Sequence, residues 1–414
     1  MRIKPTFAAG VVVGLAAAIG VASMLANSPQ QGEVSPVKAF SPRGTYYPNT
    51  EDLASNEMRI ISCGTGMPNQ RPAQAASCFL VELGNGDKFI FDIGTASADN
   101  LAALVIPQDY LNKIFLSHLH GDHFGDLGAL YIGGLINGRT VPLHVYGPSG
   151  DRPERGTAHA VEGLKQMYTW DVAGRKGRFP PSGQEIIVHE FDFRGENHVV
   201  YEENGVTIRS WPAIHSLDGS VSYSLEWNGL KFVFSGDTYP NRWFREYAQN
   251  ADVLIHEAMM PLPYMIEKMN FPVERALFVN TIIHTPPPMV GRVFSEMQPR
   301  MAIAFHFFTD FDVIQDMAVG VRSTYDGPLS LASDMQVWNV TKDEITWRSI
   351  VFDDYAWSPP PAKWPPPPVD NSIAESESDW ILSGRLDYSD IVRQLYERAN
   401  EQYGTSLQPP LGGN

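Results

Sequence analysis

The alternation of apolar and polar positions along the chain predicts a layered α/β protein. Short apolar runs bounded by glycine, proline and asparagine are typical of buried strands, whereas longer stretches with apolar residues three or four apart are typical of helices. In the first half of the chain we expect strands at 59–63, 78–83, 88–92, 114–116 and 141–146, and helices around 100–106, 125–137 and 157–169. Because strands and helices alternate, the chain is expected to fold as an α/β sandwich.

Two hairpins are predicted in the middle of the chain. Asn-Gly is the preferred pair for a tight two-residue turn between antiparallel strands. The two turns and their flanking apolar runs are Asn204-Gly205 between 199–202 and 206–211, and Asn228-Gly229 between 222–227 and 230–235. Two further strands are expected at 253–255 and 301–305.

Several of the later strands lead into side chains that can bind metals or transfer protons. In chain order these side chains are His215, Asp237, His256 with Glu257, and His306. Core packing does not explain such residues at four strand ends, so we infer a functional site there. A helix is expected at 272–283. His284 then precedes a second helix, for which Thr285 is a suitable N-cap and prolines 286–288 suit the first turn.

One short segment concentrates metal-binding side chains. From His118 to His123 the sequence is His-Leu-His-Gly-Asp-His, directly after a predicted strand. A zinc ion takes about four ligands, and these four donors cannot all face one ion from one short loop. The spacing suits two neighbouring ions, with His118 and His120 on one and Asp122 and His123 on the other. Buried imidazoles without a metal would each need a separate polar partner, so we predict a metal site.

The complete candidate ligand set has seven members. They are His118, His120, Asp122, His123, His215, Asp237 and His306. If Asp237 is shared, each ion has three further protein ligands, and positions remain open for a hydroxide and a substrate, as a catalytic site requires. Asp92 directly follows an apolar run, and it is expected either to support a ligand histidine or to be a simple turn residue.

Composition and charge restrict the partners. The 414 residues include 31 Lys and Arg against 47 Asp and Glu, which gives a formal net charge of −16. Such a chain repels polyanions, so a nucleic-acid grip on a basic face is not expected. Two metal ions would still attract a small anionic ester. The one concentrated basic segment, 174–178, is either a contact for an anionic substrate or, with preference, a solvated loop. A homo-oligomer is one option that the sequence leaves open.

The N-terminal segment predicts export. Arg2 and Lys4 precede an uncharged run from Phe7 to Ala26, and polar residues follow, as in a secretory signal peptide. The run is also about long enough for a membrane anchor, and a buried helix of a soluble protein is the third alternative. The first two place the protein in the periplasm or outside the cell. Its two cysteines, Cys63 and Cys78, are then either bridged or separate buried thiols.

The chain divides into four parts where its composition changes. We expect a signal or anchor at 1–30, a linker without periodicity at 31–56, the α/β domain at 57–355, and a proline-rich extension at 356–414. The prolines between 358 and 368 favour an extended polyproline strut. A helical pattern follows and ends at Gly404. This tail is expected to act as a lid, to bind a neighbouring subunit or to strap the surface.

Together these motifs resemble the metallo-β-lactamase superfamily, in the branch that holds ribonuclease Z and the zinc-dependent arylsulfatases. The motifs that carry the resemblance are the Gly64-Thr65-Gly66 loop, His-x-His-x-Asp-His at His118–His123, His215, Ser235-Gly236-Asp237-Thr238, His256-Glu257-Ala258, His284-Thr285 and His306. The resemblance implies an αββα sandwich with two metal ions at one edge. It implies that His118, His120 and His215 hold one zinc and that Asp122, His123 and His306 hold the other, with Asp237 bridging. The ligands alone do not separate zinc from iron or manganese.

The resemblance also implies a hydrolase in which Glu257 and His284 form a proton-handling pair. We expect a metal-bridging hydroxide to attack a phosphodiester or sulfate ester. Asp122 would orient this nucleophile, and His284, held by Glu257, would protonate the leaving oxygen. A lactone or carboxylic ester is the alternative substrate. A ribonuclease Z-type endonuclease is less favoured, because the sequence lacks a Gly/Lys-rich clamp for tRNA, and a non-catalytic metal-binding module is the remaining alternative.

Overall fold

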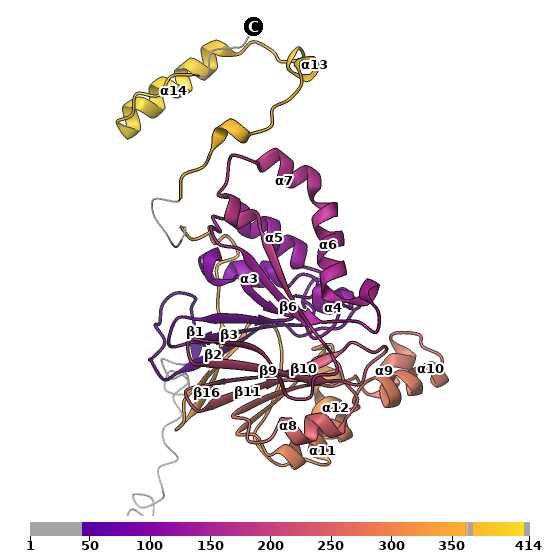
Figure 1. Cartoon of the computed structure of the whole chain (residues 1–414). Helices are drawn as coiled ribbons and strands as arrows, with labels where there is room; N and C mark the ends of the chain where they lie inside the picture. Colours follow the sequence, from indigo (N-terminus) through magenta and orange to yellow (C-terminus); the bar gives the residue numbers. More distant parts are fainter. Residues whose placement is uncertain (1–43, 361, 363–366, 410–414) are drawn as a thin grey trace, which may run out of the picture.

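A computed structural model describes residues 44–360, 362 and 367–409. Two β-sheets pack face to face, and helices cover both outer surfaces (Figure 1). The αββα sandwich expected from the sequence is therefore confirmed. The predicted signal or anchor at 1–30 lies outside the described residues. Within the described part, every helix is too short or too polar to cross a membrane.

The first sheet has nine strands, and its central part joins an antiparallel region to a parallel one. Strands β2 to β4 pair antiparallel, whereas β4 to β7 pair parallel. In spatial order the strands are β1 (Thr45–Tyr46), β16 (Ile345–Ile350), β15 (Gln336–Val340), β2 (Met58–Gly64), β3 (Cys78–Leu83), β4 (Lys88–Phe91), β5 (Lys113–Phe115), β6 (Leu143–Pro148) and β7 (Ile186–Phe191).

The second sheet has seven strands and contains both predicted hairpins. Its spatial order is β14 (Leu329–Leu331), β13 (Met301–Phe305), β12 (Val253–Glu257), β11 (Leu230–Phe234), β10 (Val221–Trp227), β9 (Val206–Pro212) and β8 (His198–Glu203). At both hairpin turns the asparagine and the glycine have positive φ, 53° and 76° at Asn204-Gly205 and 51° and 75° at Asn228-Gly229. This is the backbone that a tight Asn-Gly turn requires.

Aromatic side chains fill the space between the two sheets. Phe79 and Phe91 from the first sheet meet Phe234 from the second at ring-centroid distances of 5.6 and 6.0 Å. All three rings are fully buried. Burying each phenylalanine contributes roughly 2–3 kcal/mol, so this layer fixes how the sheets lie on each other. The strand ends that carry the candidate site are positioned by this core.

Helices form the two outer layers. On the first sheet they are α3 (Ser97–Ala103), α4 (Gly121–Phe124), α5 (Leu127–Ile136), α6 (Thr157–Met167) and α7 (Thr169–Arg175), and on the second α8 (Arg242–Tyr247), α9 (Leu262–Glu267), α10 (Val273–Phe278), α11 (Pro287–Met297) and α12 (Phe311–Arg322). Short 3₁₀ turns lie at Gln108–Tyr110, Pro153–Arg155, Pro181–Gln184 and Asn371–Ile373. Helices α9 and α10 project from one edge of the sandwich (Figure 1). Two further buried apolar clusters join the helices to the sheets.

Three local predictions are corrected. Residues 44–56 are not a free linker, because β1 pairs in parallel with β16 and Tyr46 is buried beneath Arg59. The helix expected at 272–283 is regular only to Phe278 and continues as a π-helical turn, η4 (Val279–Ile283). Thr285 does not cap the next helix. Its hydroxyl donates to the Thr238 carbonyl at 2.6 Å, and Pro286 takes the N-cap position.

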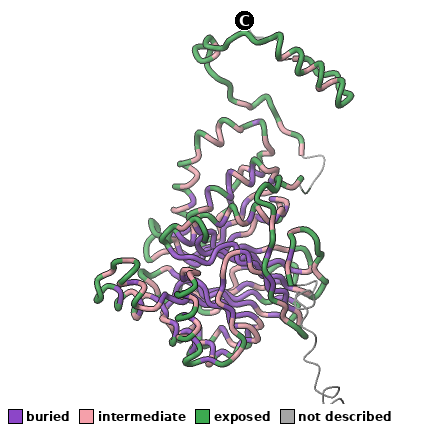
Figure 2. Tube along the Cα trace, turned by 180° about the vertical axis from the view of Figure 1, so that it is seen from behind, coloured by how far each residue is buried: buried purple, intermediate pink, exposed green. Residues whose placement is uncertain are grey.

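The C-terminal extension is largely exposed, as Figure 2 shows. It contains α13 (Asp379–Leu382) and α14 (Ser389–Tyr403), and α14 ends as predicted at Gly404, whose φ is 67°. Part of the proline run lies outside the described residues. In the basic segment, Arg175 pairs with Asp171 at 2.6 Å and Lys176 lies 3.9 Å from Glu375 of the extension. The segment is a loop only after Arg175, because Gly174 and Arg175 form the end of α7.

Candidate metal centre

The candidate ligands lie on loops at one edge of the sandwich, where strands from both sheets end. His118 and His120 follow β5, and Asp122 and His123 lie in the first turn after them, on α4. The remaining three, His215, Asp237 and His306, follow β9, β11 and β13. The sandwich therefore brings together side chains that are up to 188 residues apart in the sequence, from His118 to His306.

Glycine allows two of these loops to approach each other. Gly236 has a φ of 57°, and a Cβ atom there would lie 2.5 Å from the Ser117 side chain. Neither the backbone conformation nor the space suits another residue. This close approach sets Asp237 against the His118 loop. A Cβ at Gly94 would lie 2.0 Å from the Asp122 carbonyl oxygen, so the Asp92 loop reaches Asp122 for the same reason.

Four side chains form what we call the outer group, namely His118, His120, His215 and Asp237. His120 Nδ1 lies 3.1 Å from both His118 Nε2 and His215 Nε2. Asp237 Oδ2 lies 3.9 Å from His118 Nε2 and 3.7 Å from His215 Nε2. His120 is exposed, whereas His118 and Asp237 are buried. The outer group thus combines three imidazoles and one carboxylate at the solvent boundary.

A second set, the inner group, consists of Asp122, His123, His306 and again Asp237. His306 Nε2 lies 3.2 Å from both Asp122 Oδ2 and Asp237 Oδ2. His123 Nε2 lies 3.4 Å from Asp122 Oδ2 and 3.2 Å from Asp237 Oδ1. All four residues are buried. Asp237 is common to both groups, as the sharing in the sequence prediction requires.

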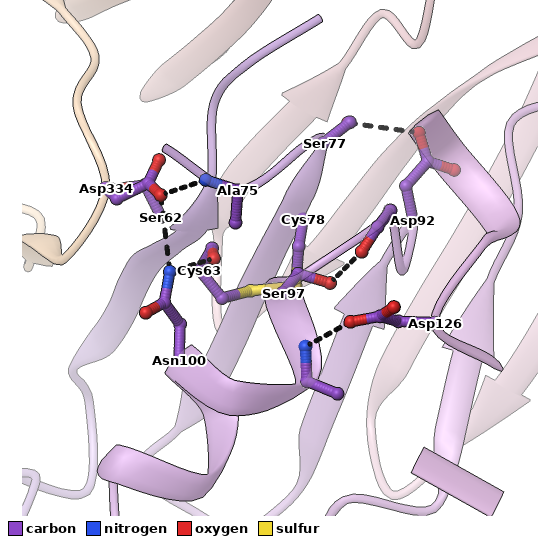
Figure 3. The surroundings of a disulfide bond; sticks show 12 residues. Ser62, Cys63, Ala75, Ser77, Cys78, Asp92, Ser97, Asn100, Asp126 and Asp334 are labelled. Carbon is purple, nitrogen blue, oxygen red and sulfur yellow. Dashed lines mark hydrogen bonds between the residues drawn. A yellow bond between two sulfur atoms is a disulfide. The ribbon is translucent and has the colours of Figure 1, made fainter. Parts of the chain in front are cut away.

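Asp92 supports the inner group from behind. Its Oδ2 lies 2.6 Å from His123 Nδ1, which leaves His123 Nε2 to face the site. Ser117 donates to the same carboxylate from its amide at 2.7 Å and from its hydroxyl at 2.8 Å, and Ser77 lies 3.4 Å away (Figure 3). Of the two roles considered for Asp92, the histidine partner is the one that the geometry supports.

Asp92 and His306, neither of which is glycine, adopt a left-handed backbone. Asp92 has a φ of 58° and His306 a φ of 71°. Such a conformation costs about 1–3 kcal/mol for a residue other than glycine and persists where the surroundings enforce it. The His306 amide donates to the Thr65 carbonyl at 2.9 Å, and Gln74 donates to the Thr65 hydroxyl at 3.0 Å and to the Phe307 carbonyl at 2.9 Å. The loop from Gly64 to Ser77 therefore holds His306 in place.

A disulfide closes the base of that loop. Cys63 and Cys78 are bridged, on the neighbouring antiparallel strands β2 and β3 (Figure 3). Of the two alternatives left open by the sequence, the bridged one is observed. Asp334 adds a second constraint, because it accepts hydrogen bonds from the Ala75 amide at 2.6 Å and from the Thr65 hydroxyl at 2.7 Å.

Glu257 and His284 form a pair beside Asp237. His284 Nδ1 lies 3.0 Å from Glu257 Oε1 and 4.0 Å from Asp237 Oδ2. The His284 ring stacks on His306 at a centroid distance of 5.1 Å. The same Glu257 oxygen accepts from the amides of Thr238 and Thr285, at 3.3 and 3.2 Å. Glu257 is thus fixed by two loops and in turn fixes His284.

Burial and neighbouring charges shift the pKa values of the site in opposite directions. Burial lowers the pKa of His215 to about 3, although Asp237 opposes it. Burial would also lower the pKa of His284, but the Glu257 carboxylate raises it to about 9. Burial would raise the pKa of Asp237, yet His123 and His306 hold it well below its usual range. His215 is thereby neutral and Asp237 ionised, the forms in which these side chains bind metals, whereas the Asp237, Asp122 and Asp92 carboxylates raise the pKa of His123 well above its usual range.

The residues fit metal ions by their chemistry. Nitrogen and oxygen donors are the usual zinc ligands, and each group offers four of them within 4.8 Å of one another. Two of the facing atoms, His123 Nε2 and Asp237 Oδ1, are buried without a hydrogen-bond partner. Buried polar atoms are nearly always satisfied, so a cation between them accounts for the arrangement. Glu257, His284 and His306 also lie close enough to hold an ion.

The structure brings together the candidate site residues named from the sequence, except His256, which is fully buried with its ring against Phe244 and its Nδ1 2.7 Å from the Glu257 carbonyl oxygen. The seven candidate ligands, Glu257 and His284 all line one edge, and Asp92 lies directly behind them. Sequence reasoning missed Ser117 and Asp334. Ser117 stands immediately before the histidine cluster, and that position was a usable signal. Asp334 had none, because its contacts with the Gly64–Ser77 loop span about 260 residues.

Comparison with known proteins agrees with this geometry. Residues 71–243 match the family model of the metallo-beta-lactamase superfamily. Ribonuclease Z of Mycobacterium marinum is 30% identical over 208 residues, which cover 48% of this chain and 70% of that protein. Ribonuclease Z of Mycobacterium avium is 29% identical over 203 residues, covering 48% and 69%.

Solved structures show the same fold. The metallo-beta-lactamase fold protein YhfI of Bacillus subtilis aligns with a TM-score of 0.51 at 18% identity, covering 69% of this chain and all of that one. The short form of human tRNase Z aligns with a TM-score of 0.50 at 18% identity, covering 67% and 98%. With its curated ribonuclease Z relatives, the chain belongs to the metallo-beta-lactamase superfamily of metal-dependent hydrolases.

Proposed function

We propose that this protein is an exported hydrolase that uses two zinc ions to cleave a phosphodiester or sulfate ester of a small anionic substrate. One observation carries the proposal. Asp237 belongs to both ligand groups and also lies 4.0 Å from His284, which Glu257 holds at 3.0 Å. Paired metal positions with an adjoining proton donor suit the hydrolysis of an ester.

Each side chain has a defined task in this proposal. The outer group would hold one ion and the inner group the other; bound there, the ions supply a water molecule with a pKa of about 7 and neutralise charge on the ester oxygens. Asp122 orients the attacking water. His284 donates a proton to the leaving oxygen from Nε2, because Glu257 occupies Nδ1. Glu257 is a positioning residue that fixes the tautomer and the direction of that ring.

Charge and relatives together define the substrate class. The names of the ribonuclease Z relatives support a phosphodiester. The net charge of −16 opposes a long polyanion, and the Arg175 and Lys176 side chains are engaged by carboxylates. We therefore favour a small ester over RNA. A ribonuclease Z-type endonuclease is the second candidate, because those relatives carry that name, and a lactone or carboxylic ester is the third.

Export is part of the proposal. The N-terminal run from Phe7 to Ala26 supports it in the sequence. The Cys63–Cys78 bridge supports it independently, because disulfides persist in oxidising compartments and are rare in the cytosol. A fusion of residues 1–60 to a reporter that is active only outside the cytoplasm is expected to be active. An inactive fusion would remove the localisation from the proposal and leave the chemistry untouched.

A metal analysis and a substrate panel test the chemistry. The full chain, purified as expressed, is expected to contain about two zinc ions per molecule by mass spectrometry. It is then assayed on bis(p-nitrophenyl) phosphate, p-nitrophenyl sulfate, a short lactone and a tRNA precursor. Highest kcat/KM on the first two supports the proposal. A preference for the tRNA precursor selects the endonuclease, a preference for the lactone selects the third candidate, and no turnover on any substrate contradicts all three.

A further inference from the structure

A cavity of about 220 Å³ lies between α8 and α11, on the outer surface of the second sheet (Figure 1). One wall is α8 together with the loop before it, and the other is the C-terminal part of α11. The lining residues belong neither to the two ligand groups nor to the Glu257–His284 pair. Pockets for drug-sized molecules have volumes of roughly 300–1,000 Å³, so this cavity suits a smaller ligand.

Three of the lining residues are apolar. Phe244 is 2% and Met297 4% exposed. Val293, one turn before Met297 on α11, is partly buried and packs against the same apolar cluster. Because the burial energy follows the apolar area that is removed from water, these side chains favour a ligand with an apolar body.

The cavity also has one positive charge to spare. Of its two arginines, Arg242 donates to Glu196 at 2.8 Å. The one carboxylate at the cavity, Glu296, accepts from Arg292 at 3.0 Å. Within the described part of the chain, the guanidinium of the second arginine, Arg245, makes neither an ion pair nor a hydrogen bond. A ligand with a single anionic group would therefore complete the cavity.

One wall of the cavity is held rigidly by Asn241. The side-chain oxygen of Asn241 accepts from the Phe244 amide at 2.8 Å, and its Nδ2 donates to the Thr238 hydroxyl at 3.0 Å. The same hydroxyl accepts from the Ile214 amide at 3.1 Å. These bonds fix the loop between Asp237 and α8. A cavity that is formed before the ligand arrives requires little reordering, which favours binding.

We propose that this cavity binds a small organic monocarboxylate with an apolar body, at a site separate from the metal centre. The carboxylate pairs with Arg245, because a guanidinium and a carboxylate can form two parallel hydrogen bonds. The apolar body packs on Phe244, Val293 and Met297. A dianion is disfavoured, because Glu296 brings a negative charge to the same cavity. This inference goes beyond the proposed function and requires no metal ion.

Three probes separate the charge from the apolar body. Hexanoate carries both, acetate carries the charge with almost no apolar body, and 1-hexanol carries the body without the charge. Saturation-transfer NMR titrations of the full chain, purified as expressed, are expected to give a Kd for hexanoate at least about tenfold lower than for either other probe. Arg245→Gln, which removes the charge, should raise the hexanoate Kd about tenfold. Val293→Phe, which fills the cavity, should raise it by about the same factor.

Arg393→Gln is the matched control, because Arg393 is also an exposed arginine on a helix, α14. Its hexanoate Kd should equal that of the wild type, and a rise there would mean non-specific attraction and overturn the inference. Hexanoate bound to a metal ion instead would be unaffected by R245Q and V293F. That result, or equal binding of hexanol, also overturns the inference and leaves the proposed function standing. Arg245 is exposed, so R245Q should fold and decides the question even if V293F is unstable.

Discussion

The outer and inner ligand groups share Asp237 yet are built differently. In the outer group, His120 is exposed to solvent and lies against the imidazoles of His118 and His215. In the inner group every member is buried, Asp92 holds His123, and the Gly64–Ser77 loop holds His306. A ligand whose far nitrogen is fixed by a carboxylate binds its metal more tightly. If each group holds an ion, we expect the ion in the inner group to be retained more tightly and the ion in the outer group to exchange more readily.

Removal of the Asp237 carboxylate, which both groups share, should weaken metal binding in the outer and inner groups alike. It is expected to have the largest effect on activity. Asp237→Asn keeps the shape and deletes the charge, so we expect both ions to be lost in dialysis. Loss of about 4 kcal/mol of transition-state stabilisation corresponds to a roughly thousandfold lower kcat/KM. Metal analysis and ester hydrolysis measure this. Asp218→Asn, an exposed change in the nearby loop 213–219, is the control. Two retained ions in D237N would contradict the sharing.

Removal of His284, the proposed proton donor, should slow ester hydrolysis without changing metal binding by either ligand group. His284→Ala is expected to lower kcat on esters with poor leaving groups by about a hundredfold and on p-nitrophenyl esters much less, because a good leaving group needs no proton. Metal content should stay near the wild-type value. Glu257→Gln should show the same pattern more weakly. The exposed His159→Ala is the control, and equal losses on both ester types would rule out the proton-transfer role.

Removal of the support behind His123 should affect the inner group alone. Asp92→Asn is expected to weaken the more tightly held ion by about 10–100-fold, so that a chelator titration no longer resolves two steps. Asp126→Asn is the control, because Asp126 is a nearby, partly buried carboxylate that accepts from the Ala98 amide and contacts no ligand histidine. If D92N keeps a two-step titration, the inner position does not owe its retention to Asp92.

The disulfide can be removed to ask how far the inner group depends on its loop. The bridge joins residues 15 apart, for which loop closure predicts about 3 kcal/mol of stability. C63A/C78A should unfold at a correspondingly lower denaturant concentration. It should also lose the ion of the inner group before the ion of the outer group. Wild-type protein unfolded with and without a reductant provides the comparison. If the variant releases the ion of the outer group first, the inner group does not depend on the disulfide.

The smallest effect is expected from Asp334, which holds the same loop. Burial raises the pKa of its carboxyl to about 6, against four hydrogen bonds that lower it. Because the folded-state pKa lies above the unfolded value, this group stabilises the fold fully below pH about 4, and the contribution is lost as the pH rises through about 6. The change amounts to at most about 3 kcal/mol. Denaturation of wild type and D334N between pH 4 and 7.5 isolates it, since asparagine does not titrate. Parallel pH profiles would refute the assignment.

Much of the fold and of the site could be predicted because the signals are local. The Asn-Gly turns set both hairpins, and the His118–His123 run with the later histidines and Asp237 names the ligands before any fold is known. What failed depends on distant partners. The two-residue strand at Thr45–Tyr46 has no periodicity and forms only against β16. Thr285 has the right residue type for a cap, but its hydroxyl donates to the Thr238 carbonyl, 47 positions away in the sequence. The π-helical turn and the Cys63–Cys78 pairing likewise follow from tertiary packing and strand register.

The left-handed backbone at Asp92 and His306 sets stability against activity. Glycine adopts this conformation without strain, so D92G or H306G would be expected to recover about 1 kcal/mol per site of backbone energy while deleting a side chain that belongs to the inner ligand group or supports it. At Asp92 this gain is opposed, because the Ser117 amide and hydroxyl would lose their buried acceptor. Directed evolution of this enzyme should therefore score turnover and melting temperature together.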